Sequence, residues 1–209
     1  HYNGLIPRNP FIQFHISPNV KEREYLTEDE LKAVMTHEFA DSKLAYIRDI
    51  FIFASFTVVS FVDIRELTND NIVEVNGEKW ILSKRHKTKV AFQVKLLDIP
   101  LQIVERYRPM QKDNRIFPDL NYWSICKPLK RMIRECGITK SISFHCSRHG
   151  FATLALSKGM PIESVSRVLG HTNIVTTQLY AKITTQKLDN DLTMFGDKLS
   201  KTFNGITMS

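Results

Sequence analysis

The pattern of apolar and polar residues predicts a chain that is mostly helical. Apolar positions recur at helical spacing in segments bounded by capping residues, glycines and prolines, which are typical helix start and stop signals. The predicted helices cover about residues 27–39, 43–59, 61–67, 101–111, 122–136, 145–158, 161–170, 172–180 and 186–201. The segment 43–59 is apolar on most sides, so we expect it to be the buried central helix.

One stretch in the middle of the chain changes to the two-residue period of β-strands. Residues 72–75 and 79–82 flank Asn76-Gly77, a pair that accepts the positive φ angles of a type I′ turn, so they predict a hairpin. Residues 90–97 predict a third strand, and 85–89 form a basic connection before it. The expected fold class is therefore mainly α (α+β), a helical domain with a small three-stranded antiparallel sheet.

The first part of the chain differs from the rest. Residues 1–23 contain three prolines and no helical period, and we interpret them as an extended linker. Thr27 and Glu30 then form a capping box, which marks the start of the folded domain. Because the chain begins with His1 and not with Met, we expect it to be a fragment of a longer protein.

Composition and charge favour a polyanionic partner without identifying it. The 209 residues suffice for one core, and the net charge is +7 with a pI of about 9.3. Basic residues concentrate at 79–95 and at 127–134. These segments are either two solvated faces or a groove that follows a DNA backbone.

Two further features indicate the cellular compartment. No segment has the length and apolar character of a membrane span, so we expect no membrane partner. The three cysteines, Cys126, Cys136 and Cys146, lack C-x-x-C spacing and are interpreted as reduced thiols. The expected location is therefore the cytoplasm.

The residues most suited to chemistry lie near the C-terminus. His145, Arg148 and His149 share one face at the start of a predicted helix, where free amides and the Arg148 guanidinium favour an anion such as phosphate. The i, i+4 histidine pair also fits zinc. However, Arg148 between them would repel a cation and the motif has no carboxylate, so we expect no metal.

Two later residues extend this constellation. His171 follows Leu169-Gly170, and Tyr180 lies nine residues further on. Taken separately, His171 could be a turn residue and Tyr180 a core aromatic. Together with His145 and Arg148, they place three donors for a phosphate ahead of one phenol that could attack it.

These motifs resemble the tyrosine recombinase (phage integrase) family. The residues that match its signature are His145-x-x-Arg148-His149, Leu169-Gly170-His171 and Tyr180. In addition, Arg85-x-Lys87-Thr88 resembles the β-hairpin lysine motif, and Leu26-Thr27-x-x-Glu30-Leu31 resembles the opening of the catalytic domain. The resemblance covers roughly residues 23–185 and is greatest to integrases of conjugative transposons and related mobile elements.

The resemblance implies a site-specific recombinase that cuts and rejoins DNA without a metal or cofactor. Tyr180 would attack the scissile phosphate to give a 3′-phosphotyrosyl link, and Lys87 would protonate the leaving 5′ oxygen. Arg148 would bind the non-bridging oxygens, while His145 and His171 stabilise the transition state. Behind these catalytic residues, Asp63 and His149 would support the site.

The sequence departs from the family pattern at one important position. Ser60 stands where the family has its first arginine, and Val58 stands where it has a glycine. Losing such a donor commonly lowers the rate about a hundredfold or more. The preferred substitute is Arg85, which would point the same way as Lys87 if both lay on a strand. Arg48 is a second candidate, although twelve helical residues separate it from Ser60 by about 18 Å.

The resemblance also predicts domains and partners. Residues 1–23 would leave an N-terminal core-binding domain, 24–185 would form the catalytic domain, and 186–209 would be a C-terminal helix and tail exchanged between protomers. Partners would be double-stranded DNA at recombination sites, a homotetramer on DNA and accessory DNA-bending factors in a bacterial cytoplasm. Two alternatives remain open: a type IB topoisomerase, and a DNA-binding relative that does not cleave, which Ser60 and Val58 favour.

Overall fold

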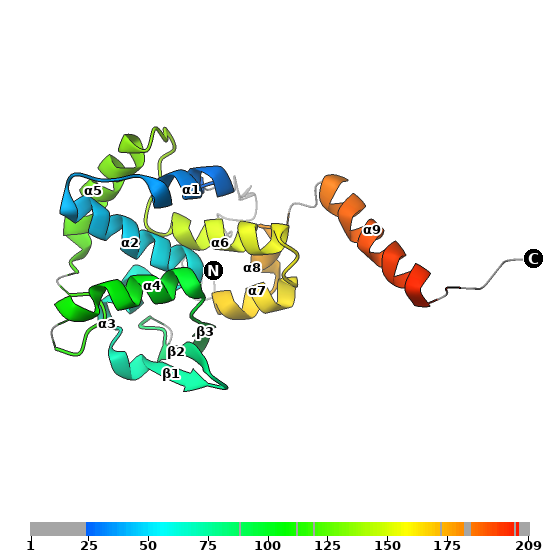
Figure 1. Ribbon diagram of the computed structural model, residues 1–209, viewed down its shortest axis with the longest axis horizontal. Helices are drawn as coiled ribbons and strands as arrows, with labels where there is room; N and C mark the ends of the chain where they lie inside the picture. Colours follow the sequence, from blue (N-terminus) through cyan, green and yellow to red (C-terminus); the bar gives the residue numbers. More distant parts are fainter. Residues whose placement is uncertain are drawn as a thin grey trace, which may run out of the picture.

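The computed structural model describes a helical body, a small sheet and a separate C-terminal helix (Figure 1). It describes residues 24–87, 89–111, 113–118, 120–171, 173–181, 185–202 and 204, with the side chains of 122–124, 185–187 and 190 left aside. The predicted linker 1–23 lies outside the described residues, as do Thr88 of the lysine motif and the predicted helix cap Thr172. None of the described helices is both long and apolar enough to cross a membrane.

The helices agree with the sequence prediction to within a few residues. They are α1 Glu28–Thr36, α2 Ser42–Thr57, α3 Phe61–Glu66, α4 Asp98–Tyr107, α5 Tyr122–Glu135, α6 Cys146–Ser157, α7 Ile162–Leu169, α8 Val175–Gln178 and α9 Thr185–Thr202. Short 3-10 turns at Asn69–Asn71 and Arg108–Met110 were not predicted. Helix α4 begins before Pro100, not after it, because proline is tolerated in the first turn of a helix.

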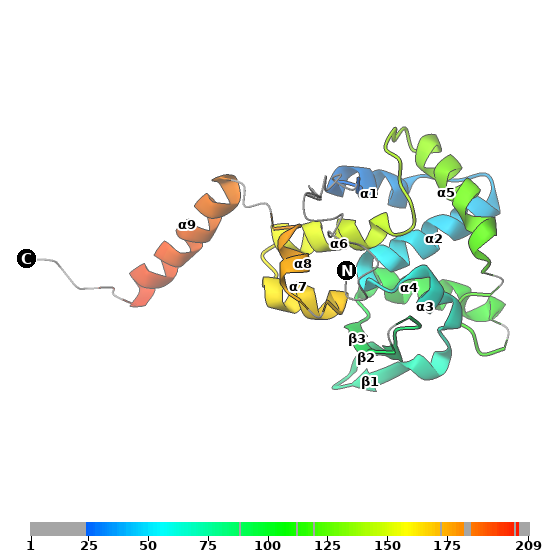
Figure 2. The same cartoon turned by 180° about the vertical axis from the view of Figure 1, so that it is seen from behind.

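The predicted central helix, α2, is the centre of the core. Most of its residues are buried, including Phe51 and Phe53, and it packs against α1, α4, α5 and α6. Figure 2 shows these helices around α2 from behind. The capping box that starts α1 is present, since Thr27 Oγ1 accepts from the amide of Glu30 and the Glu30 carboxylate accepts from the amide of Thr27. A local capping signal thus fixes where α1 begins, whereas packing in the core stabilises α2.

The three strands form the predicted antiparallel sheet in the order β1-β2-β3. They are β1 Ile72–Val75, β2 Glu78–Lys84 and β3 Ala91–Lys95. Asn76 and Gly77 both have positive φ angles in the hairpin between β1 and β2, as the type I′ turn requires. Ile81, Phe92 and Val94 turn inward to the core, which ties the sheet to the helical body and fixes where the β2–β3 turn lies.

A buried carboxylate joins α2 to α4. Asp49 accepts from Arg48 Nε at 2.8 Å, from Arg106 Nη1 at 2.7 Å and from the Tyr107 hydroxyl at 2.8 Å. Burial, reinforced by the neighbouring carboxylate, raises the pKa of the Tyr107 phenol, so this hydroxyl remains a donor. These three hydrogen bonds offset the free-energy cost of burying the charged Asp49 carboxylate.

We expect Tyr107→Phe to lower the free energy of unfolding by about 1–2 kcal/mol, because it removes one hydrogen bond from the buried Asp49 and keeps the ring. Urea denaturation of the two proteins at neutral pH measures this difference. An unchanged midpoint would mean that the two arginines satisfy Asp49 without the phenol.

Candidate active site

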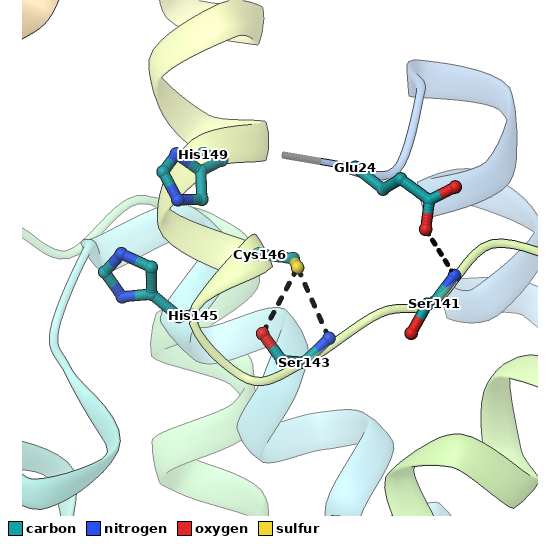
Figure 3. Close-up of a pocket in the computed structure, with 6 residues that line it drawn as sticks. All are labelled: Glu24, Ser141, Ser143, His145, Cys146 and His149. Atoms are coloured by element: carbon teal, nitrogen blue, oxygen red, sulfur yellow. Dashed lines mark hydrogen bonds between the residues drawn. The ribbon is translucent and has the colours of Figure 1, made fainter. Parts of the chain in front are cut away.

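Helix α6 places three of the predicted residues at its first turn. His145 immediately precedes the helix, and Arg148 and His149 lie within its first turn. The His145 ring is edge-on to the His149 ring, with centroids 4.7 Å apart, and Figure 3 shows the two rings on the same side of α6. His145 is exposed, Arg148 is half-buried, and His149 is buried. The predicted shared face is therefore present, with each side chain at a different depth.

Tyr180 lies beside this face. It was predicted on a helix with Thr172 as cap, but α8 ends at Gln178, so Tyr180 occupies the turn that follows. Its hydroxyl lies 2.6 Å from His149 Nδ1. The ring is partly buried against an apolar cluster that includes Val58 and Leu169. The structure thus joins the predicted nucleophile to a residue that the sequence gave only a supporting role.

Arg148 spans the site from α6 to the end of α7. Its Nη2 donates to the Leu169 carbonyl. Burial lowers its pKa to about 10, and the nearby positive charge of Arg85 acts in the same direction, while Tyr180 and Asp63 oppose it. Arg148 is still charged at neutral pH, and its guanidinium is close enough to Arg85 to be affected by it.

His171 is positioned by the chain reversal after α7. Gly170 ends α7 in the left-handed conformation, with φ of 66°, which glycine adopts without strain. His171 Nδ1 then lies 2.9 Å from the hydroxyl of Thr177, a buried residue of α8. Burial and then the charge of Arg148 lower the pKa of His171, so the neutral ring is favoured. In the tautomer in which Nδ1 accepts from the Thr177 hydroxyl, the ring proton is on Nε2, which can donate to an anion.

The predicted supporting residue Asp63 connects α3 to the turn after β2. Its Oδ2 accepts from Arg85 Nη1 at 3.2 Å and from Ser60 Oγ at 2.8 Å. Its Oδ1 accepts from the backbone N–H of His86 at 2.7 Å. Ser60 also caps α3, because its Oγ accepts from the Asp63 amide. One buried carboxylate therefore fixes both a guanidinium and the backbone of the lysine motif.

Arg85 extends from this carboxylate into the site. Its Nη1 also donates to the Val58 carbonyl at 3.2 Å, and its Nη2 donates to the Val168 carbonyl at 3.3 Å. The guanidinium carbon lies 4.0 Å from the centroid of the Phe92 ring. Only 11% of the side chain is exposed. Arg85 and Arg148 are thus held on the carbonyls of two successive residues, Val168 and Leu169.

The condition behind the strand argument for Arg85 is not met. As predicted for the connection 85–89, β2 ends at Lys84, so Arg85 and Lys87 both lie in the turn before β3. The turn is closed by Arg85 N to Val90 O at 2.8 Å and by Lys89 N to Arg85 O at 2.8 Å. The site contacts of Arg85 come from Asp63, not from strand alternation. Lys87 is exposed in the same turn.

The second substitute, Arg48, lies in a different environment. Its Nε pairs with Asp49, its Nη1 donates to the His37 carbonyl at 2.8 Å, and its guanidinium carbon lies 5.8 Å from the centroid of Phe39. These contacts hold it beside the end of α1. Arg85 therefore lies near Arg148, whereas the Arg48 side chain lies between α1 and α2.

Val58, at the family's glycine position, shows why glycine suits this place. It caps α2 in the left-handed conformation, with φ of 60°, and is fully buried. A β-branched residue rarely adopts this conformation, which favours glycine. The conformation directs the Val58 carbonyl at Arg85, so the strained residue contributes to the site through its backbone.

A pocket of about 460 Å³ lies next to these groups (Figure 3). It is lined by Glu24, Ser141, Ser143, His145, Cys146 and His149. In Figure 3 the Cys146 thiol faces away from the two histidine rings and contacts Ser143. Among the described residues, no group of three or more His, Cys, Asp or Glu is arranged to hold a metal ion.

The sequence reasoning missed two parts of the site. Thr177, which contacts His171, gave no signal because its role depends on how α8 packs. The Ser60–Asp63 pair had a detectable signal, since Ser-x-x-Asp is a helix-capping pattern. We interpreted Ser60 only as a missing arginine.

Comparison with known proteins identifies relatives along most of the chain. The model of the phage integrase family matches residues 24–187. The chain is 31% identical over 177 residues to tyrosine recombinase XerA of Pyrococcus horikoshii, which covers 78% of this chain and 58% of XerA. It is 26% identical over 200 residues to tyrosine recombinase XerC of Lactobacillus leichmannii, which covers 88% of this chain and 67% of XerC. The chain thus spans less than two thirds of the XerA relative.

Solved structures share the fold. The Tn1549 transposon integrase in complex with a circular intermediate DNA superposes with a TM-score of 0.75 at 16% identity, covering 92% of this chain and 73% of that one. XerH bound to a palindromic difH substrate gives a TM-score of 0.68 at 22% identity, covering 87% and 56% respectively. The likeness confirms the predicted fold class, a mostly helical domain with a three-stranded antiparallel sheet. The fold, the order of the motifs and the match over residues 24–187 place this chain in the phage integrase family, the tyrosine recombinases.

Proposed function

We propose that this chain is the catalytic domain of a site-specific DNA recombinase that cuts and rejoins DNA through a 3′-phosphotyrosyl intermediate. The observation that carries the proposal is the pairing of Arg85 and Arg148 on the Val168 and Leu169 carbonyls, beside His171 and close to Tyr180. Two guanidinium groups are held close together despite their like charge. This arrangement suits an anion with two non-bridging oxygens, such as a phosphodiester.

In this mechanism the Tyr180 oxygen attacks the scissile phosphorus, and the bond to the 5′ oxygen breaks. Lys87 gives its proton to that oxygen as it leaves. Arg148 and Arg85 bind the two non-bridging oxygens, where negative charge increases in the transition state, while His145 and His171 donate to the same group. The covalent link conserves the phosphodiester for rejoining to a new 5′-hydroxyl.

Arg85 takes the role of the arginine that Ser60 does not supply. A guanidinium at position 60 would start from the last residue of the α2–α3 connection, three residues before Asp63. Here the Ser60 hydroxyl and Arg85 Nη1 share the same Asp63 oxygen, at 2.8 Å and 3.2 Å. The positive charge therefore reaches the acidic partner from the β2–β3 turn.

Because Arg85 supplies the charge, two proposed catalytic groups, Arg85 and Lys87, depend on the position of the same turn. Arg85 and Lys87 lie in one turn, and the Asp63 contacts to Arg85 and to the His86 amide anchor this turn on the body. Movement of the turn would displace both cations together. A substrate that orders the turn would accordingly bring in the phosphate clamp and the general acid in one step.

The finer biological assignment also remains our proposal. We place the full-length protein among integrases of conjugative transposons and related mobile elements, supported by the fold likeness to the Tn1549 integrase. Its partners would be double-stranded recombination sites bound by a homotetramer, with an N-terminal core-binding domain closing around the DNA. Accessory DNA-bending factors would assist assembly.

Cleavage on a nicked duplex tests the proposed function. The nick lets the short 5′-hydroxyl fragment diffuse away, so the full-length protein should accumulate as a covalent protein–DNA band on duplexes drawn from DNA flanking its own gene. Tyr180→Phe should abolish the band because it lacks the attacking oxygen. Tyr46→Phe is the matched control, since the Tyr46 hydroxyl donates to the Pro118 carbonyl within the core.

The same substrates separate the alternatives. Binding without a covalent band in the unmodified protein would favour the DNA-binding relative that does not cleave. A covalent band with relaxation of supercoiled DNA, and with no requirement for two paired sites, would favour a type IB topoisomerase. Recombinant products that need two sites would support the recombinase.

Arg85→Ala should lower the rate of covalent complex formation about a hundredfold or more, because it removes a transition-state donor. Arg48→Ala is the control, because it removes the same kind of side chain. It should retain the rate within a few fold, since Arg48 contacts Asp49 and His37 and not the proposed site. Single-turnover cleavage with saturating protein measures both. Equal rates for Arg85→Ala and the unmodified protein would assign Arg85 to packing alone.

Helix α9 is the proposed element of exchange between protomers. Figure 1 shows it standing apart from the body, and four of its exposed apolar residues recur at spacings of three and four. These residues are Leu188, Leu192, Phe195 and Leu199. Such a stripe typically packs against a partner, and we propose that the partner is a second copy of this chain.

We expect the double substitution Leu192→Glu and Phe195→Glu to reduce assembly of two-site complexes on DNA, since it places charge within the apolar stripe. Asp191→Glu and Lys198→Arg on the same helix are controls that keep the stripe intact. Native gel shifts with one-site and two-site duplexes report the change. Unaltered two-site complexes would exclude α9 as the contact between protomers.

A further inference from the structure

We infer that His149 is the base that receives the phenolic proton of Tyr180 when the tyrosine attacks. This inference rests on the proposed function, in which Tyr180 is the nucleophile. The resemblance to the recombinase family gives His149 only a supporting role, whereas the geometry places one of its ring nitrogens within hydrogen-bond distance of the reacting oxygen.

The contact has the geometry that proton transfer requires. His149 Nδ1 lies 2.6 Å from the Tyr180 hydroxyl oxygen. A general base must lie within hydrogen-bond reach of the proton it removes, about 2.6–3.2 Å between heavy atoms. The two rings are tilted by 43° with centroids 5.3 Å apart, so the contact is made through the polar atoms and not by ring stacking. His149 is therefore in place before any movement of Tyr180.

The surrounding packing holds the imidazole in this orientation. His149 is only 6% exposed, and its ring meets that of His145 edge-on, at 83°. Its backbone lies in the first turn of α6, which packs against α7, and α7 in turn contacts α8, just ahead of Tyr180. The histidine and the phenol thus approach each other from two packed elements, which limits how far either can turn.

The proton balance of the reaction needs such a group. When the bond from Tyr180 oxygen to phosphorus forms, the phenolic O–H bond breaks and its proton must leave. Arg85, Arg148 and Lys87 carry protons already and can only donate. His171 has Nδ1 on Thr177 and its other nitrogen directed to the phosphate in the proposed site. The neutral His149 ring accepts the phenolic proton at Nδ1, while Lys87 supplies the separate proton of the 5′-hydroxyl.

The charged and titratable groups around the pair support this direction of transfer. Arg148 lies close enough to Tyr180 for their charges to interact, so its guanidinium can stabilise negative charge that develops on the tyrosine oxygen. On α6, His145 and Cys146 lie beside His149, and Glu24, from the segment before α1, lines the same pocket (Figure 3). The Glu24 carboxylate accepts from the Ser141 amide at 2.6 Å. In Figure 3 this carboxylate points toward Ser141 and away from the two histidine rings.

Single-turnover cleavage of the nicked duplex across a pH series tests the inference. We compare the unmodified full-length protein with His149→Asn, whose side-chain polar atom takes the place of Nδ1 but cannot take up the proton, and with His149→Leu. Both should cleave about a hundredfold or more slowly, the usual contribution of a general base. The loss of rate toward acid pH that protonation of His149 causes should disappear in His149→Asn.

A sulfur substrate then assigns the step. In a duplex with sulfur in place of the bridging 5′ oxygen, the leaving group departs as a thiolate and needs no general acid. Lys87→Ala should recover most of its rate on this substrate, whereas His149→Asn should remain slow. Recovery of His149→Asn on the sulfur substrate would overturn the inference, because it would place His149 on the leaving-group side.

Further outcomes separate this inference from the proposed function. His149→Asn cleaving at the unmodified rate, with an unchanged pH profile, would overturn the inference alone and make His149 a packing residue. If the unmodified protein forms no covalent band, the proposed function fails, and the role of His149 fails with it. Thermal unfolding and binding to the intact duplex establish that His149→Asn is folded. Because Asn is polar and close to His in size, this variant keeps the test usable even where His149→Leu unfolds.

Discussion

The carboxylate of Asp63 holds together the cationic part of the site. It is buried at the start of α3, where the Ser60 hydroxyl and its own backbone amide fix its position. From there it accepts one hydrogen bond from the Arg85 guanidinium and one from the His86 amide. Because a buried carboxylate needs such partners, the turn that carries Arg85 and Lys87 is drawn to the helical body. The sheet is thereby placed relative to α6 and α7.

This arrangement keeps two positive charges close together before any anion is bound. Burial, and then the charge of the neighbouring Arg85, lower the pKa of Arg148. Each guanidinium is compensated in part by a backbone carbonyl, Val168 for Arg85 and Leu169 for Arg148. A phosphodiester would add negative charge to that of the Asp63 carboxylate, which already pairs with Arg85. The repulsion that the free protein tolerates thus favours binding of the anion.

The same region illustrates how a fold can keep a site while its sequence changes. Val58 retains the left-handed backbone that glycine adopts easily, and its carbonyl accepts from Arg85. In the proposed site, the charge comes from the β2–β3 turn in place of the α2–α3 connection. An electrostatic site depends on where the charge lies, so the position of the guanidinium matters more than the segment of chain that supplies it.

The sequence by itself determined the elements and the chemically active residues. Apolar periodicity, the Thr27–Glu30 capping box and the Asn76-Gly77 turn act over a few residues, and for this reason α1, α2 and the β1–β2 hairpin were predicted close to their observed bounds. Tertiary structure decided the contacts between elements. Arg85 reaches Asp63 across 22 residues and Tyr180 reaches His149 across 31. Such contacts follow from how α3, α6, α8 and the sheet pack together, and no local pattern encodes this packing. Spacing could name Arg85 and Arg48 as candidates, and only the packed structure distinguished them.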